Sequence, residues 1–486
     1  MNGAGDRGDP RRGLRRRASL VVDLLRAEGA AAVADRALDH WAEGRRRRQF
    51  EAEDLAKLPA VPVLGVTAAP PVPWLGGVPA QLGVRMREEE RLGDTALLYP
   101  ECGGQRLEVV AAGRRVATDL SGTATFDPDH AALALSGEPY DGQKPLGEEG
   151  GTEAASWTAL VMRAADVVRA RLVHVEGAAG LPLDGLVALA RRRPLVLALH
   201  DFALCCPRAN LYDESRGASC GCCADAATCQ ATLAASGHPG AAYALRWRER
   251  GAELVAACRC VIYPSQFLLD AHLRLFGNAG ADARVIAPGI EGARMEPWRW
   301  PWTPRSAAPT IAFLGGGAAH KGSLLLAAVI REWLRRGLQP LRWQVLGGGR
   351  PEQLRALRKM PGVRVRGYYR HGSLGGLLRA RRVELALLLP QVPESFSLIL
   401  SECLAAGVPV MALAQGALAE RLAASGGHLL PEGAGAGEIV AALQEWVVGG
   451  LAVPAPPPPM PSSRDAAAAF ARLYDELSRH EPPATE

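Results

Sequence analysis

The sequence predicts an α/β protein with two doubly wound domains, each built on a parallel sheet. Short runs rich in Val, Ile and Leu, such as residues 63–67 and 385–389, alternate with longer stretches rich in Ala, Leu and Arg. This alternation is typical of parallel strands that are covered by helices on both faces. A chain of 486 residues is too long for one hydrophobic core, so two domains are expected.

Three apolar runs in the first half predict strands of an N-terminal domain, at residues 63–67, 172–176 and 195–199. The first run leads into a Pro-rich loop that contains Gly76 and Gly77, and a helix is expected after it. Glycine leaves room for backbone N–H groups to approach a diphosphate closely. Residues 101–158 are less regular, and their strand-like stretches predict an inserted hairpin.

Two acidic residues stand eight positions apart at a strand–helix junction in the second half. The strand at 385–389 is stopped by Pro390, and the next helix covers residues 397–406. In a doubly wound sheet, nucleotides bind beyond the carboxyl end of a strand and over the next helix N-terminus. Glu394 in the loop can face a transferred group, and Glu402 can accept hydrogen bonds from ribose hydroxyls. The alternative is a solvated helix start whose acidic residues the helix dipole favours.

This segment resembles the E-x7-E signature of retaining, nucleotide-sugar-dependent glycosyltransferases with the GT-B fold, the family 4 type of glycosyl transferases group 1. The resemblance covers residues 60–480 in the family's motif order. Residues 261–265 and 285–290 close the N-terminal half as in family members, and residues 311–315 open the second half. The resemblance implies two Rossmann-like domains facing a cleft, a UDP- or GDP-sugar as co-substrate, and no catalytic metal.

The resemblance also assigns roles to residues of the second half. Lys321 matches the family's lysine, which acts as a point charge on the departing phosphate. Glu394 is expected to position the donor sugar, and Tyr368 follows the strand end whose backbone contacts the nucleobase. The expected donor-binding set comprises Gly76, Gly77, Gly316, Lys321, Tyr368, Ser397, Leu398 and Glu402.

Two positions depart from the family pattern. Where the family has Arg, five positions before the lysine, this chain has Gly316, and Arg350 is the candidate to replace the charge. Where many members end an H-x-H strand in His, this chain has Glu176, two residues after His174. Side chains two apart on a strand share a face. Glu176 is expected to act as a general base or a sugar-hydroxyl ligand, His200 is the other catalytic candidate, and His174 is expected to be a core residue.

Positive charge is concentrated at the N-terminus. Residues 1–50 hold twelve Arg and seven Asp or Glu, a balance of +5 that equals the net charge of the whole chain. Leu and Val at helical spacing separate two arginine clusters, so residues 1–58 are expected to form a basic helical extension. It can rest on an anionic membrane, where each Arg contributes about 1 kcal/mol. It can equally pack on the N-terminal domain as a solvated helix, whereas the scarcity of aromatic residues disfavours nucleic acid.

Six of the ten cysteines fall between residues 205 and 229. In a cytosolic protein such clustering favours metal thiolates over disulfides, and Cys206, Cys220, Cys223 and Cys229 are the candidate ligands of a structural Zn²⁺. The spacing is not the paired C-x2-C arrangement, so reduced cysteines that pack a long loop are the alternative. The loop is expected to overhang the acceptor cleft, where Arg208 either contacts an anionic acceptor or is a surface charge.

No apolar run approaches about 18 residues and the N-terminus lacks a hydrophobic signal core, so a cytoplasmic protein is expected. The basic segment adds the option of a peripheral position on the inner face of the cell membrane. The expected parts are the extension at 1–58, an acceptor domain at 59–296, a linker at 297–309, a nucleotide-sugar-binding domain at 310–450, and a Pro-rich spacer with a helix that crosses back at 451–486.

The expected function is transfer of a hexosyl group from a nucleotide sugar, with retention, to a glycan or lipid-linked acceptor in the synthesis of a cell-surface polysaccharide or glycolipid. Lys321, Glu394 and Glu402 favour this enzyme. Gly316 and Glu176 favour the alternative, a catalytically weak GT-B partner or scaffold protein in such a pathway. A nucleotide-sugar epimerase shares the architecture but not the E-x7-E helix, and fold likeness by itself is only a prior.

Overall fold

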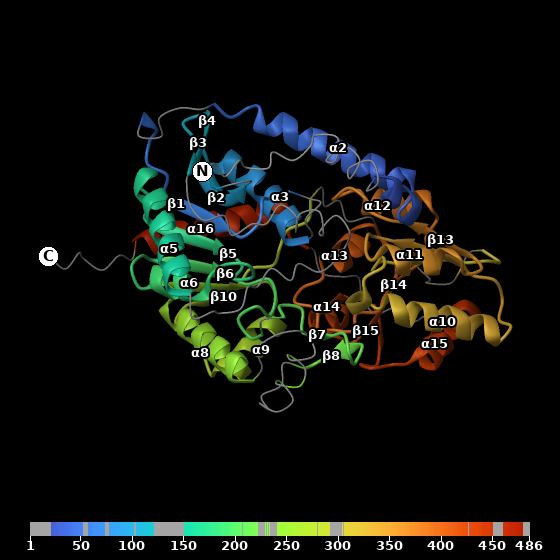
Figure 1. Ribbon diagram of the computed structural model, residues 1–486. Coiled ribbons are helices and arrows are strands. Elements are labelled where there is room, and N and C mark those ends of the chain that lie inside the picture. The colour runs from blue at the N-terminus through green and yellow to red at the C-terminus, as the bar shows by residue number, and fades with distance from the viewer. Residues whose placement is uncertain are drawn as a thin grey trace, which may run out of the picture.

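The protein forms two α/β domains, each around its own parallel sheet, as the sequence predicts (Figure 1). The computed structural model describes residues 21–51, 57–72, 77–101, 104–120, 150–206, 208–221, 229, 231, 233, 241–278, 280–291, 304, 306–425, 427–450 and 460–479. The first arginine cluster, Gly76, Cys223 and most of the expected linker lie outside these residues.

An eight-stranded sheet organises the N-terminal domain, in the order β10-β9-β6-β5-β1-β2-β3-β4. The strands from β10 to β2 run parallel, and β2, β3 and β4 form an antiparallel meander at the edge. The expected hairpin is therefore β3 and β4, which extend the sheet. The strands are β1 (Val63–Thr67), β2 (Thr95–Glu101), β3 (Gly104–Ala111), β4 (Arg114–Leu120), β5 (Leu172–Glu176), β6 (Leu195–Ala198), β9 (Cys260–Tyr263) and β10 (Ala283–Val285).

A six-stranded parallel sheet organises the C-terminal domain, in the order β13-β12-β11-β14-β15-β16. In chain order this is the 3-2-1-4-5-6 arrangement of a doubly wound sheet, which binds ligands where the strand order reverses. That switch point lies between β11 and β14, beyond their carboxyl ends. The strands are β11 (Thr310–Phe313), β12 (Arg342–Leu346), β13 (Val363–Arg366), β14 (Leu385–Leu388), β15 (Val410–Leu413) and β16 (His428–Leu430).

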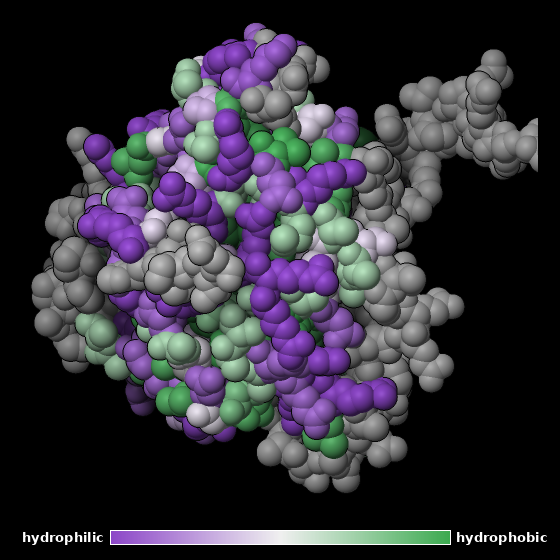
Figure 2. Space-filling view, turned by 90° about the vertical axis from the view of Figure 1, so that its left-hand side faces the viewer, coloured by the Kyte–Doolittle hydropathy of each residue, from purple (hydrophilic) through white to green (hydrophobic). Residues whose placement is uncertain are grey.

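Helices cover both faces of each sheet. In the N-terminal domain, one face packs on α5 (Gly150–Val167), α6 (Leu183–Ala190), α8 (Ala241–Ala257) and α9 (Gln266–Phe276). The other face packs on α3 (Gly77–Leu92) and α16 (Ser463–Arg479), which returns from the C-terminal domain. Hydrophilic and hydrophobic residues are interspersed on the outer side of this domain (Figure 2).

The C-terminal sheet is covered in the same way. One face packs on α10 (Ser323–Arg335), α11 (Pro351–Arg358) and α15 (Ala436–Gly449). The opposite face packs on α12 (Leu374–Ala380), α13 (Leu398–Ala405) and α14 (Ala417–Ser425). The loops also contain the turn η3 (Ala319–Lys321) and a small hairpin of β7 (Tyr212–Asp213) and β8 (Ala218–Ser219).

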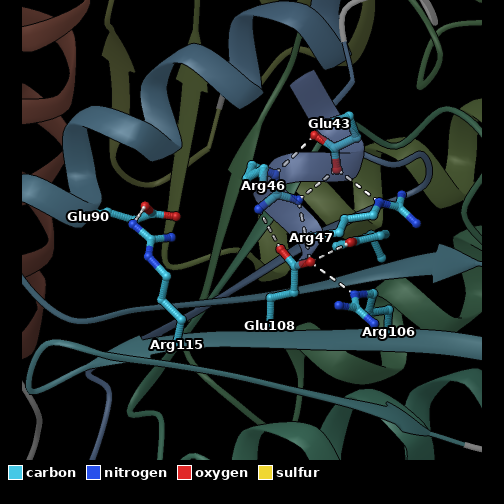
Figure 3. A network of polar contacts seen from close by, with 8 residues as sticks. Glu43, Arg46, Arg47, Glu90, Arg106, Glu108 and Arg115 are labelled. Atoms are coloured by element: carbon cyan, nitrogen blue, oxygen red, sulfur yellow. Dashed lines mark hydrogen bonds and ion pairs between the residues drawn. The ribbon is translucent and has the colours of Figure 1, made fainter. Parts of the chain in front are cut away.

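The described part of the basic extension bridges the two domains. Residues 21–27 are helical, and α2 (Ala30–Arg47) follows and spans the top of the molecule (Figure 1). At its end Arg46 binds Glu43 of the same helix and Glu108 of β3, at 2.9 to 3.0 Å (Figure 3). At its start Glu28 contacts the C-terminal domain. The extension thus packs on both domains, whereas only the N-terminal one was expected. No described helix has the length and apolarity needed to cross a bilayer.

Candidate functional site

A cavity of about 360 Å³ lies between the two domains. It opens at the carboxyl ends of β5, β6 and β9, under the first turns of α3, and faces the loops that follow β11 and β14. Its position at both switch points is where a doubly wound sheet binds ligands. Its lining includes Gly77, Gln81, Arg85, Glu176, His200, Lys321, Glu394, Ser397, Leu398 and Phe470.

Lys321 and Glu394 form an ion pair at the C-terminal side of the cavity. The Lys321 Nζ lies 2.6 Å from the Glu394 Oε1, and the two side chains are 34% and 12% exposed. Lys321 ends η3 after β11, and Glu394 lies in the loop after β14, so the sheet order brings them together. The Ala417 N–H donates to the Glu394 carbonyl at 2.8 Å, which ties this loop to the start of α14.

The turn that starts α13 is strained, and hydrogen bonds from α14 stabilise it. Ser397 has φ of 69°, a left-handed conformation that is uncommon for a residue with a side chain. Arg421 of α14 donates to the carbonyls of Phe396 and Ser397 at 2.7 and 2.9 Å and lies over the Phe396 ring. Burial lowers the pKa of Arg421 to about 10, so it stays charged at pH 7. Leu398 and the positive end of α13 are thereby aimed at the cavity, a position suited to an anion.

A second cluster of charges lies on the N-terminal side of the cavity. Glu176, at the end of β5, forms an ion pair with Arg85 of α3. The His200 Nε2 lies 3.1 Å from the Glu176 Oε2, and the His174 Nε2 lies 3.2 Å from Oε1. His174 and Glu176 therefore share a face of β5, as expected. On its other nitrogen, His174 lies 2.5 Å from the Tyr474 hydroxyl of α16.

Charge states in this cluster follow from burial and pairing. Burial by itself would raise the pKa of Glu176, but the Arg85 guanidinium and the hydrogen bond with His200 hold it well below its usual range. Burial lowers the pKa of His174 to about 4, so the ring is neutral at pH 7. The cluster therefore presents an ionised, firmly paired carboxylate beneath His200.

Glu402 lies outside the lining of the cavity. Burial raises the pKa of this carboxyl to about 7, although a hydrogen bond from the Gly372 N–H partly offsets that effect, and Glu291 lies near enough to raise it further. Glu402 therefore titrates near neutral pH, and it lies on the face of α13 turned toward the loop that precedes α12.

Position 316 is occupied by glycine for a steric reason. Its φ is 55°, and its N–H donates to the Leu346 carbonyl at 3.1 Å, so its turn packs against the glycine turn that follows β12. Any Cβ here would collide with the carbonyl of Gly348. The arginine expected from the resemblance does not fit, and Gly316 is absent from the lining of the cavity. Arg350, the candidate to replace that charge, pairs with Glu214 of the N-terminal domain.

Tyr368 and the preceding Gly367 follow β13, but they lie under the N-terminal extension. The Gly367 N–H donates to the Glu28 carbonyl at 2.9 Å, and the Tyr368 N–H donates to the Glu28 Oε2 at 2.9 Å. The backbone expected to contact a nucleobase is thus bonded to the protein itself.

The cysteine-rich loop packs against the N-terminal core. Cys206, Cys220 and Cys229 are buried there. Within the described residues there is no cluster of three or more His, Cys, Asp or Glu that would hold a metal ion, so the expected zinc site is not supported. Arg208 donates to the Tyr212 carbonyl at 3.1 Å. Tyr212 in turn lies against His320, next to Lys321, so the loop borders the interdomain contact.

The structure therefore gathers Gly77, Glu176, His200, Lys321, Glu394, Ser397 and Leu398 around one cavity, whereas Gly316, Tyr368 and Glu402 are not part of its lining. Sequence reasoning missed Arg85 and Arg421. The signal for Arg85 was helical spacing, because Gly77, Gln81 and Arg85 recur every four residues on one face of α3. Arg421 carried no such signal, because its role depends on the packing of α14 behind the Ser397 turn.

Comparison with known proteins agrees with this architecture. Residues 308–447 match the family of glycosyl transferases group 1, so the C-terminal domain is a domain of that type. No curated protein sequence matches the chain. Among solved structures, it is similar to sucrose-phosphate synthase from Thermosynechococcus elongatus, with a TM-score of 0.57, 13% identity, and 87% of this chain and 100% of that chain covered.

A second similar structure is an α,α-trehalose-phosphate synthase (UDP-forming) from Burkholderia vietnamiensis, with a TM-score of 0.52, 10% identity, and 86% of this chain and 96% of that chain covered. A glycosyltransferase from Rickettsia africae gives a TM-score of 0.50 at 11% identity, with 86% and 100% covered. At such identities the likeness concerns the fold. The expected GT-B fold is confirmed.

Proposed function

We propose that the chain is a retaining glycosyltransferase whose nucleotide-sugar donor binds the C-terminal domain and whose acceptor binds the N-terminal domain. The observation that carries the proposal is the Lys321–Glu394 pair at the switch point of the C-terminal sheet, which lines the same cavity as Glu176 and His200. The match of residues 308–447 to glycosyl transferases group 1 supports the same placement of the donor.

Breaking the bond between a sugar and a nucleoside diphosphate requires that developing phosphate charge be neutralised. Lys321 supplies a cation, and the start of α13 supplies backbone N–H groups and the positive end of a helix dipole. Glu394, held by its ion pair and its loop, accepts hydrogen bonds from donor-sugar hydroxyls. One bound donor can contact all of these groups at the same time, because all of them line the same cavity.

Glu176 is better suited to bind a sugar hydroxyl than to act as a general base. A base works best when its pKa lies near the working pH. The pKa of Glu176 is instead held far below it, and Arg85 already neutralises the carboxylate. We assign Glu176 to positioning the sugar, with His200 beside it facing the acceptor side of the cavity.

Donor binding is tested by thermal shift and calorimetric titration with UDP, GDP, TDP, ADP and CMP. One diphosphate is expected to stabilise the folded protein, by about 2.7 kcal/mol at a concentration one hundred times its Kd. Lys321→Ala should weaken that affinity about tenfold or more, since a hydrogen bond to a charged group is lost. Glu394→Gln should slow transfer more than it weakens binding.

The matched control is Lys359→Ala, an exposed lysine of the same domain that lies outside the cavity. Equal affinity in wild type, Lys321→Ala and Lys359→Ala would refute the donor placement. Absence of binding by every nucleotide would favour the second candidate, a GT-B partner or scaffold protein. The bonds from Glu28 to the backbone of Gly367 and Tyr368 favour that candidate.

The acceptor is proposed to be a glycan or lipid-linked group at the cytoplasmic face of the cell membrane, and the extension supplies the reason. Four of its acidic side chains, Glu28, Asp35, Asp39 and Glu43, are at most 18% exposed and bind arginines. The outward side of residues 21–48 instead carries Arg26, Arg45 and Arg48 with hydrophobic residues. The large hydrophobic residues exposed there are Val21, Val22, Leu25, Leu38 and Trp41. An anionic bilayer surface matches this combination of apolar and basic groups.

Membrane binding is tested by co-sedimentation with vesicles of phosphatidylglycerol and phosphatidylcholine. The wild type should sediment with mixed anionic vesicles and not with pure phosphatidylcholine. Leu38→Ser with Trp41→Ser should reduce sedimentation, because these side chains are 49% and 58% exposed on the outward side. Leu245→Ser, which alters a residue 43% exposed on α8, is the control and should leave it unchanged. Equal sedimentation with anionic and with pure phosphatidylcholine vesicles would contradict the proposal.

A further inference from the structure

The inward side of the N-terminal extension is built around Glu28. This residue lies in the turn between the helical residues 21–27 and α2, and its side chain is 2% exposed. Its carbonyl accepts from the Gly367 N–H, and its carboxylate accepts from the Tyr368 N–H, both at 2.9 Å. Both N–H groups stand at the carboxyl end of β13, on the ligand side of the C-terminal sheet.

The contact is closely fitted. A Cβ on residue 367 would collide with the Glu28 side chain, so the fit requires glycine there. Arg36 donates to both carboxylate oxygens of Glu28, at 2.8 and 3.0 Å. The Arg36 guanidinium also lies over the Tyr368 ring, 4.4 Å from its centroid. Glu28 and Arg36 thus form an ion pair whose guanidinium lies over an aromatic ring and whose carboxylate accepts from the adjoining backbone.

That arrangement has the features of a bound nucleobase. A base also presents a planar face for stacking and acceptor atoms at its edge for backbone N–H groups. We propose that residues 21–47 form an autoinhibitory strap, in which Glu28 and Arg36 occupy the nucleobase subsite and must leave before a nucleotide donor binds in full. The proposal rests on the donor site proposed above.

The strap contacts a different domain at each of its ends. On the C-terminal domain, Asp39 accepts from the Tyr368 hydroxyl at 2.5 Å and from the Arg370 Nε at 2.9 Å, and Arg366 pairs with Asp35. On the N-terminal domain, Arg46 and Glu108 hold the other end of α2 (Figure 3). Displacement from β13 therefore leaves α2 attached to the N-terminal domain.

The test compares the Kd of the cognate nucleoside diphosphate for wild type, Glu28→Ala and Asp39→Asn by calorimetry. The affinity of a partly blocked site is reduced by the fraction that is open. Both variants loosen the strap, so both are expected to bind about tenfold tighter or more if the open fraction of wild type is small. Asp23→Ala is the matched control, because it removes a carboxylate from the same segment that lies 3.7 Å from Arg355 and does not touch Gly367 or Tyr368. Its Kd should equal that of wild type.

Hydrogen exchange gives a second readout. Saturating diphosphate should speed exchange of residues 21–29 in wild type, and Glu28→Ala should expose the Tyr368 amide in the absence of nucleotide. Equal Kd values in wild type and both strap variants, with unchanged exchange of residues 21–29, would overturn the strap and leave the donor site intact. Failure of every diphosphate to bind any of these proteins would overturn both proposals.

Discussion

Glu402 shows how one residue's surroundings change its chemistry. Burial in α13 raises its pKa to about 7 from an ordinary value of 4.5. Between these two pKa values, the folded protein therefore keeps a proton on Glu402 that the unfolded chain has released. Stability from this group is present below pH 4.5 and is lost as the pH rises through 7. A ribose hydroxyl or another hydrogen-bond donor at this position would contact a carboxyl that titrates in the physiological pH range.

Glu402→Gln is expected to remove this pH dependence. At pH 8 the variant should be more stable than wild type by about 1 to 3 kcal/mol, because it avoids a buried charge. The difference should shrink toward pH 5. Urea unfolding of both proteins between pH 5 and 8 measures it, with exposed Glu432→Gln as the control. Parallel stability curves for wild type and Glu402→Gln would show that the carboxyl titrates normally.

At the scale of elements, α2 is attached to β3 through a buried carboxylate rather than an apolar seam (Figure 3). The Glu108 side chain is 2% exposed and accepts from Arg46 at 2.9 Å, Arg106 at 2.9 Å and the Tyr99 hydroxyl at 2.8 Å. Its desolvation is compensated only while these donors remain in place. The attachment of the extension to the N-terminal domain therefore depends on a polar network with little exposure to solvent.

Glu108→Ala should destabilise the protein by about 3 kcal/mol, since it leaves two arginines without their shared partner in a buried setting. Exchange of α2 amides should accelerate in the same variant. Asp119→Ala is the matched control: its carboxylate is 77% exposed and lies 3.7 Å from Arg106. An exposed pair of this kind contributes less than about 1 kcal/mol. Equal losses in the two variants, measured by thermal and urea unfolding, would contradict the role given to Glu108.

At the scale of the whole molecule, the two domains are joined across the cavity itself. The Ser265 hydroxyl donates to the Ser395 carbonyl at 2.6 Å, and the Ser395 hydroxyl donates to the His200 carbonyl at 2.5 Å. The Phe267 N–H donates to Glu420 at 2.6 Å. These bonds hold the loop of Glu394 against the N-terminal domain.

Much of the fold was predictable from local sequence. The runs at 63–67 and 172–176 coincide with β1 and β5, and the helix expected at 397–406 is α13 (Leu398–Ala405). Apolar periodicity, proline and glycine act over a few residues, so they specify elements and the loops that end them. Parallel strands then place loop residues at one edge of a sheet, which is how Lys321 and Glu394, 73 positions apart, come together.

The sequence by itself thus determined the two sheets, their helices and the candidates at the carboxyl ends of the strands. Only the tertiary structure decided which candidates share a cavity and what else reaches them. Arg85 meets Glu176 from 91 positions away, and Glu28 meets Tyr368 from 340. Gly316 excludes an arginine because a second glycine turn packs against it. Such contacts depend on how whole layers and domains pack, and no pattern within a short stretch of sequence specifies contacts between residues so far apart in the chain.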